Sequence, residues 1–131
     1  MKNTIFKLAE FFYYFSLLVL LILYLFPGSL AGYLLYGNLS VQPNFIANPI
    51  GNSINHLIFF SYITILAIII RSKIKNIFTS YKVILFVSFI LEPLHLVVPN
   101  RAFEFYDLIA NITGVIIVLL INNFIKWSKL H

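Results

Sequence analysis

The chain contains no cysteine, and only 10% of its 131 residues are charged. The lack of cysteine excludes disulfides, thiolate nucleophiles and cysteine-ligated metal sites. Soluble domains carry about 25% charged residues, whereas this chain is 61% hydrophobic. The shortage of charge therefore excludes an ordinary soluble domain. It predicts that residues 1–131 form a single all-α domain whose main partner is the lipid bilayer.

Four apolar stretches predict transmembrane helices over residues 11–26, 54–70, 82–98 and 107–125. Each is close to the roughly 20 residues that a helix needs to cross a bilayer. The first stretch also resembles a signal peptide, because a basic segment precedes it and Ser29-Leu30-Ala31 resembles a cleavage site. We interpret it as a retained span. The sequence thus predicts an all-α membrane protein, a four-transmembrane-helix bundle.

The basic residues predict the orientation of this bundle. If the chain crosses four times, only Arg101 lies on one side; the other eight basic residues lie opposite, namely Lys2, Lys7, Arg71, Lys73, Lys75, Lys82, Lys126 and Lys129. This spread along helix ends forms no patch, so we predict no nucleic-acid partner. The positive-inside rule places both termini in the cytoplasm, with loops 27–53 and 99–106 outside. Frequent Ile, Asn, Lys and Phe are typical of an AT-rich bacterial genome, which suggests a multi-pass protein of the bacterial inner membrane.

The loop over residues 27–53 has no charged residue but holds three of the five prolines and four of the five glycines. We therefore expect it to be irregular and rich in turns. Its apolar segment 30–36 is expected to lie in the membrane interface or to re-enter slightly.

Acidic residues number only four, and three of them (Glu92, Glu104 and Asp107) lie between residues 89 and 114. Ionisable groups in or beside a span are costly to bury, so they are candidates for function. The same stretch contains His95, Arg101 and Asn111. The spacings from Glu92 to His95 and from Asp107 to Asn111 place each pair on one helix face. We expect Pro93 to kink its helix and Gly114 to allow a close helix approach.

Structural roles are the alternative for each of these residues. Glu92 could pair with Arg101 or His95 to fix two helices. Arg101 could extend to lipid headgroups, although its fork of donors also suits a bound phosphate or carboxylate. Asp107 could serve only as a favourable charge at a helix N-terminus. Glu104 is expected to be a solvated loop acid.

His56 opens the second predicted span on the same side as this polar stretch. With His95, Glu92 and Asp107 it would provide two imidazoles and two carboxylates, a set able to bind a divalent metal. No compact motif such as His-Glu-x-x-His occurs in the sequence. We therefore predict neither a metal nor a cofactor.

The polar stretch contains, in order, Glu92-x-x-His95, Pro99-Asn100-Arg101, Asp107 and Asn111-x-x-Gly114. This order resembles the signature of the VanZ-like membrane protein family. That family usually shows Glu-x-x-Gln, Pro-Gly-Arg, Asp and Asn-x-x-Gly where the third and fourth spans meet, and a histidine that opens the second span, as His56 does here. The resemblance covers roughly residues 52–120. His95 replaces the usual glutamine, and Asn52-Ser53 replace an Asp-Lys pair. The resemblance implies a four-span envelope protein whose family is named for glycopeptide (teicoplanin) resistance and has no established reaction.

Three functions are compatible with these features. The first is an outer-facing site that binds an anionic lipid headgroup or a lipid-linked envelope precursor, with candidate residues Glu92, His95, Arg101, Asp107, Asn111 and His56. The second is an enzyme with Glu92 as acid or base, but no nucleophile motif supports it, and we assign no catalytic residue. The third is a small accessory or assembly subunit of a larger membrane complex, favoured by an aromatic content of 18%. We favour the binding site, with the subunit as the alternative.

Overall fold

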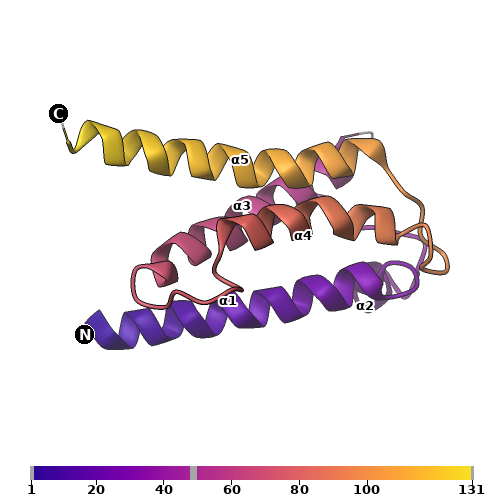
Figure 1. Cartoon of the computed structure of the whole chain (residues 1–131). Coiled ribbons are helices and arrows are strands. Elements are labelled where there is room, and N and C mark those ends of the chain that lie inside the picture. Colours follow the sequence, from indigo (N-terminus) through magenta and orange to yellow (C-terminus); the bar gives the residue numbers. More distant parts are fainter. Residues whose placement is uncertain (1, 48–49, 131) are drawn as a thin grey trace.

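A computed structural model describes residues 2–47 and 50–130, which form five helices and no strand. The prediction of an all-α fold is therefore confirmed over these ranges. The longer helices lie alongside one another, with a short helix at one end (Figure 1). The helices are α1 (Lys2–Leu25), α2 (Leu30–Tyr36), α3 (Gly51–Arg71), α4 (Tyr81–Leu94) and α5 (Phe105–Ser128). Residues 48 and 49 of the loop predicted over 27–53 lie outside the described ranges.

Three of these helices, α1, α3 and α5, are long and apolar enough to cross a membrane. Large apolar side chains are exposed on their outer faces, including Phe11 on α1, Ile65 on α3 and Phe124 on α5. Soluble monomers rarely expose continuous apolar surface of this kind. The fold is therefore compatible with a helical membrane protein.

The third predicted span is shorter than the sequence suggested. We expected it to cover residues 82–98, but α4 has 14 residues and ends at Leu94. At a rise of about 1.5 Å per residue it extends only about 21 Å, less than the roughly 30 Å hydrocarbon core. Pro93 lies in its last turn instead of kinking a longer helix, and His95 to Val97 form turns.

The segment expected at the membrane interface forms the short helix α2. The Ser29 side chain caps it by accepting a hydrogen bond from the Gly32 amide at 2.9 Å. Gly37 ends it with a φ of 67°, a conformation that suits glycine. A Cβ on Gly32 would lie 1.7 Å from the carbonyl oxygen of Val41, so α2 packs directly on the following turn. The loop predicted to be irregular is thus partly helical.

The core of the bundle forms where α3 packs against α1, α4 and, most extensively, α5. Its fully buried side chains include Tyr13, Phe60 and Val115. At Gly114 the backbones of α5 and α3 come close, because a Cβ there would lie 2.6 Å from the carbonyl oxygen of Leu57. This close approach fixes the beginning of α3 against the beginning of α5. Both of those helix beginnings carry candidate site residues.

Candidate functional site

The polar residues singled out in the sequence gather at one end of the bundle. At this end α1 and α4 finish while α3 and α5 begin, as the chain direction in Figure 1 shows. The four longer helices alternate in direction along the chain, so residues far apart in sequence lie at the same end of the bundle. The structure brings six candidate residues to this end: His56, Glu92, His95, Arg101, Asp107 and Asn111.

A hydrogen-bonded triangle of Tyr24, His56 and Asn111 joins α1, α3 and α5. The Tyr24 hydroxyl donates to Asn111 Oδ1 at 2.9 Å and lies 2.5 Å from His56 Nδ1. His56 Nδ1 lies 3.0 Å from the same Asn111 oxygen. Both contacts to Asn111 Oδ1 are hydrogen bonds when His56 Nδ1 carries hydrogen, an assignment made from the hydrogen-bond pattern. His56 Nε2 then carries no hydrogen in the neutral ring. Asn111 Nδ2 is buried and has no partner among the described residues.

Asp107 lies on the other side of the His56 ring. Its Oδ2 is 3.5 Å from His56 Nε2, and its Oδ1 accepts a hydrogen bond from the Ser53 hydroxyl at 2.6 Å. The residue is 4% exposed and lies in the first turn of α5, where the helix dipole favours a negative charge. Asp107 is therefore more than a favourable charge at the N-terminus of α5, because it also contacts two residues of α3.

Glu92 is 0% exposed, and its two carboxylate oxygens have different surroundings. Oε1 accepts hydrogen bonds from His95 Nδ1 at 3.1 Å and from the Glu104 backbone amide at 3.0 Å. Oε2 is buried and has no hydrogen-bond partner among the described residues. Of the two partners proposed for Glu92 from the sequence, the structure selects His95.

Arg101 binds the end of α1 instead of a carboxylate. Its Nη2 donates to the carbonyl oxygen of Leu23 at 2.5 Å, and its Nε donates to that of Phe26 at 3.3 Å. Carbonyls in the last turn of a helix have no partner within the helix, so Arg101 caps α1 from the loop between α4 and α5. Burial lowers the pKa of the guanidinium, and the nearby Glu92 charge opposes that shift. Nη1 makes no hydrogen bond within the described part of the chain.

The Glu104 side chain is exposed, as expected for a solvated loop acid. Burial of part of the carboxyl raises its pKa, and the negative charges of Asp107 and Glu92 raise it further. Its backbone amide nevertheless contributes to the site, because it fixes the orientation of Glu92.

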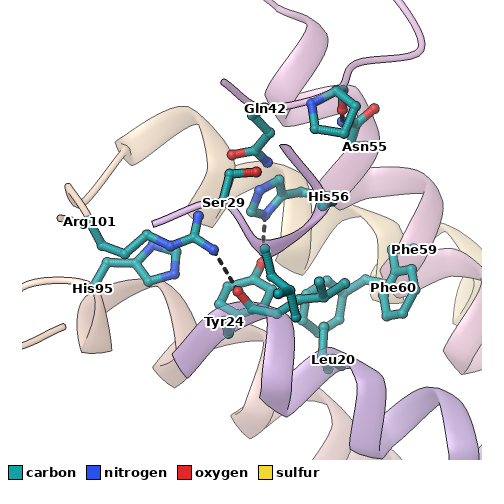
Figure 2. Close-up of a pocket in the computed structure, with 14 residues that line it drawn as sticks. Leu20, Tyr24, Ser29, Gln42, Asn55, His56, Phe59, Phe60, His95 and Arg101 are labelled. Carbon is teal, nitrogen blue, oxygen red and sulfur yellow. Dashed lines mark hydrogen bonds between the residues drawn. The ribbon is translucent and has the colours of Figure 1, made fainter. Parts of the chain in front are cut away.

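A pocket of about 160 Å³ opens between these polar groups and the apolar core. Figure 2 shows Tyr24, His56, His95 and Arg101 converging on one part of it, with Leu20, Phe59 and Phe60 lining another. The helix α2 and the segment that follows it contribute further lining residues. His95 Nε2 is buried and unpartnered among the described residues, while its ring stacks on that of Tyr24 with centroids 5.1 Å apart.

Sequence reasoning did not identify Tyr24 or Ser53 as site residues. Tyrosine near the end of a span is usually an interfacial residue, so nothing in the sequence distinguished Tyr24 from the other seven tyrosines. Ser53 was noted only as a departure from the VanZ-like pattern. Its hydrogen bond to Asp107 depends on the close packing of α3 on α5.

In three comparisons, the chain matched no protein-family model, no curated protein and no solved structure. The resemblance to the VanZ-like family therefore stays a prediction. The fold and the site are those of a helical bundle compatible with a membrane, with a partly polar pocket at one end.

Proposed function

We propose that this protein binds an amphipathic anionic ligand, a lipid headgroup or a lipid-linked envelope precursor, in the pocket at this end of the bundle. The observation that supports the proposal is the division of the pocket lining. Leu20, Phe59 and Phe60 offer an apolar surface, whereas Arg101 offers guanidinium donors and His95 a polar ring nitrogen. Ligand pockets commonly combine a mainly apolar wall with a few convergent polar groups.

Arg101 is the residue best suited to contact the anion. Its Nε and Nη2 are held by α1 carbonyls, which orients the guanidinium and leaves Nη1 for a ligand. A guanidinium fixed in this way loses little side-chain freedom on binding. His95 contributes a further polar atom, because its Nε2 is buried and has no partner among the described residues. Since Nδ1 donates to Glu92, Nε2 of the neutral ring can accept a hydrogen bond from a ligand hydroxyl.

The proposal includes a membrane topology and a family. We propose four crossings of a bacterial inner membrane, with both termini in the cytoplasm and the pocket facing outward, as in a VanZ-like protein. Two observations support this topology. Figure 1 places the two chain ends at the same end of the bundle, and α4, although short, runs toward the opposite end. The turns after Leu94 would complete this third crossing, with His95 buried and Leu96 and Val97 exposed.

Single-cysteine labelling tests this topology, since the chain has no cysteine of its own. A membrane-impermeant maleimide should label Ser40→Cys in intact cells and Lys129→Cys only after permeabilisation. Both positions are exposed, so access to the thiol reports the side of the membrane. Labelling of Lys129→Cys in intact cells would contradict a four-span topology with a cytoplasmic C-terminus.

Native mass spectrometry of gently extracted protein tests ligand binding. Ala31 lines the pocket, so Ala31→Phe should fill it and abolish retention of an anionic lipid or precursor. Leu34→Phe is the matched control on the same helix, because Leu34 is 73% exposed and does not line the pocket. Arg101→Ala is less suitable as a primary test, since it also removes the cap of α1.

Equal retention by Ala31→Phe and Leu34→Phe would contradict the proposal. A stoichiometric protein partner, with no lipid dependent on the pocket, would instead support the accessory-subunit alternative.

A further inference from the structure

Three buried side chains with metal-binding atoms meet where α3, α4 and α5 converge. One ligand atom from each of His56, Glu92 and Asp107 lies within 4.8 Å of the other two. The imidazole comes from the beginning of α3, and the carboxylates come from the end of α4 and the beginning of α5. We propose that this trio binds a single divalent transition-metal ion, of the class of Zn²⁺ or Mn²⁺.

The hydrogen bonds of His56 are those expected of a metal ligand. Metal-binding histidines usually donate the hydrogen on one ring nitrogen to a fixed acceptor, which leaves the other nitrogen as the ligand. Here Nδ1 lies 3.0 Å from Asn111 Oδ1 and serves as the donor. Nε2, on the opposite side of the ring, lies 3.5 Å from Asp107 Oδ2, and with the hydrogen on Nδ1 it presents a lone pair to that oxygen. A lone pair and a carboxylate oxygen repel each other unless a proton or a cation lies between them.

The two carboxylates are also each held by one oxygen. Asp107 Oδ1 accepts from the Ser53 hydroxyl, and Glu92 Oε1 accepts from the Glu104 amide and from His95. Glu92 Oε2 is left buried and unpartnered among the described residues. A buried carboxylate oxygen without a partner is costly, and a bound cation would remove that cost. Hydrogen bonds that orient the metal-binding carboxylates are typical of metal centres.

Distances and donor types favour a transition metal over Mg²⁺ or Ca²⁺. Metal–ligand bonds of about 2.0–2.2 Å place tetrahedral ligands about 3.4 Å apart, close to the 3.5 Å between His56 Nε2 and Asp107 Oδ2. The wider separations in the trio need side-chain shifts on the order of 1 Å to reach the same value. A donor set of one imidazole and two carboxylates suits Zn²⁺ or Mn²⁺, whereas Mg²⁺ and Ca²⁺ prefer oxygen alone.

The proposed ion would also matter for the neighbouring pocket. His56 belongs both to the trio and to the pocket lining. Two carboxylates beside a pocket disfavour an anionic ligand, and a divalent cation would neutralise them. The metal site extends the proposed function but does not depend on it, since the trio is complete within the chain.

Metal titration of the full chain in detergent tests this inference. Chelator-treated protein receives Zn²⁺, Mn²⁺ or Mg²⁺, and bound metal is measured after gel filtration, together with the shift in melting temperature. We expect one equivalent of Zn²⁺ or Mn²⁺ and a raised melting temperature, with no comparable effect of Mg²⁺. Co²⁺ serves as a spectroscopic probe, because its visible absorption reports the coordination geometry.

The shape-preserving variants Glu92→Gln and Asp107→Asn should each weaken binding at least about tenfold and abolish the Co²⁺ spectrum. Glu104→Gln is the matched control, because it removes an exposed carboxylate from the same end of the bundle and should bind like the wild type. If either variant fails to fold, the wild-type stoichiometry and Co²⁺ spectrum still decide the question. Folded wild type that binds no stoichiometric metal, or equal binding by all folded variants, would overturn the inference.

The two proposals fail separately. Metal binding is measured on delipidated protein, whereas the pocket is tested by lipid retention in Ala31→Phe. Loss of lipid in that variant with no metal bound by the wild type would refute the metal site alone. Stoichiometric metal with unchanged lipid retention would refute the pocket alone.

Discussion

Removing one oxygen atom, in Tyr24→Phe, should loosen the association of three helices at the site. The hydroxyl donates to Asn111 Oδ1 at 2.9 Å and lies 2.5 Å from His56 Nδ1, so it links α1 to both α5 and α3. The ring itself remains in the variant, and with it the stacking on His95 and the edge contact with Phe60. The substitution therefore isolates the contribution of the hydroxyl from that of aromatic packing.

The expected loss follows from the number of interhelical hydrogen bonds involved. Such bonds contribute about 0.6 kcal/mol on average in a membrane protein, and at most about 1.7 kcal/mol. Two of them involve the Tyr24 hydroxyl, which is buried, so we expect a loss of about 1–2 kcal/mol in the free energy of unfolding. Asn111 Oδ1 keeps His56 as a donor, which prevents the larger penalty of a fully unsatisfied oxygen.

Unfolding by sodium dodecyl sulfate in mixed micelles, followed by circular dichroism, measures this difference. Tyr62→Phe is the matched control, because Tyr62 is 38% exposed and its hydroxyl accepts a single 3.3 Å hydrogen bond, from Ser16, among the described residues. We expect that control to lose less than about 0.5 kcal/mol. A Tyr24→Phe protein as stable as Tyr62→Phe would refute the view that the hydroxyl holds the site together.

Three further changes have defined outcomes. Gly114→Ala should destabilise the bundle by about 1–3 kcal/mol in the same assay, because its Cβ would lie 2.6 Å from the Leu57 carbonyl oxygen. Arg101→Ala should cost about 1–2 kcal/mol by removing both hydrogen bonds to the end of α1, and Arg101→Lys should recover part of that loss. The pKa of Glu104 is raised in the folded state. The stability of the wild type relative to Glu104→Gln should therefore increase as the pH falls from neutral through that pKa.

Each of these expectations has a contrary result. A Gly114→Ala protein of unchanged stability would mean that α3 and α5 can separate at no cost. Equal stability of Arg101→Ala and Arg101→Lys would show that the guanidinium does not support α1. A constant difference between wild type and Glu104→Gln across the pH range would rule out a raised pKa of that carboxyl.

The position of the site could be predicted because it depends on where residues lie along antiparallel helices. Glu92 near the end of one span, and His56 and Asp107 at the beginnings of two others, must fall at the same end once the chain direction alternates. The three long spans were equally predictable from uninterrupted apolar stretches of about 20 residues. Neither inference required knowledge of side-chain contacts.

The partners within the site could not be predicted, because they depend on contacts between helices. Arg101 was expected to offer its fork of donors to a phosphate or a carboxylate, yet two of its nitrogens cap α1. Tyr24 looked like one aromatic residue among many in an apolar helix. The shortness of α4 arises from turns after Leu94 that the hydrophobic pattern concealed, since Leu96, Val97 and Val98 are as apolar as the helix itself.

Photo-crosslinking with a phosphate-bearing lipid that carries a diazirine tests most directly whether the pocket holds an anionic amphipath. Adducts mapped by peptide mass spectrometry should fall on pocket residues such as Ala31 and Phe59 and should disappear from Phe59 in the Ala31→Phe variant. Adducts confined to lipid-facing positions such as Phe11 and Phe86, and unchanged by that variant, would contradict the proposed function.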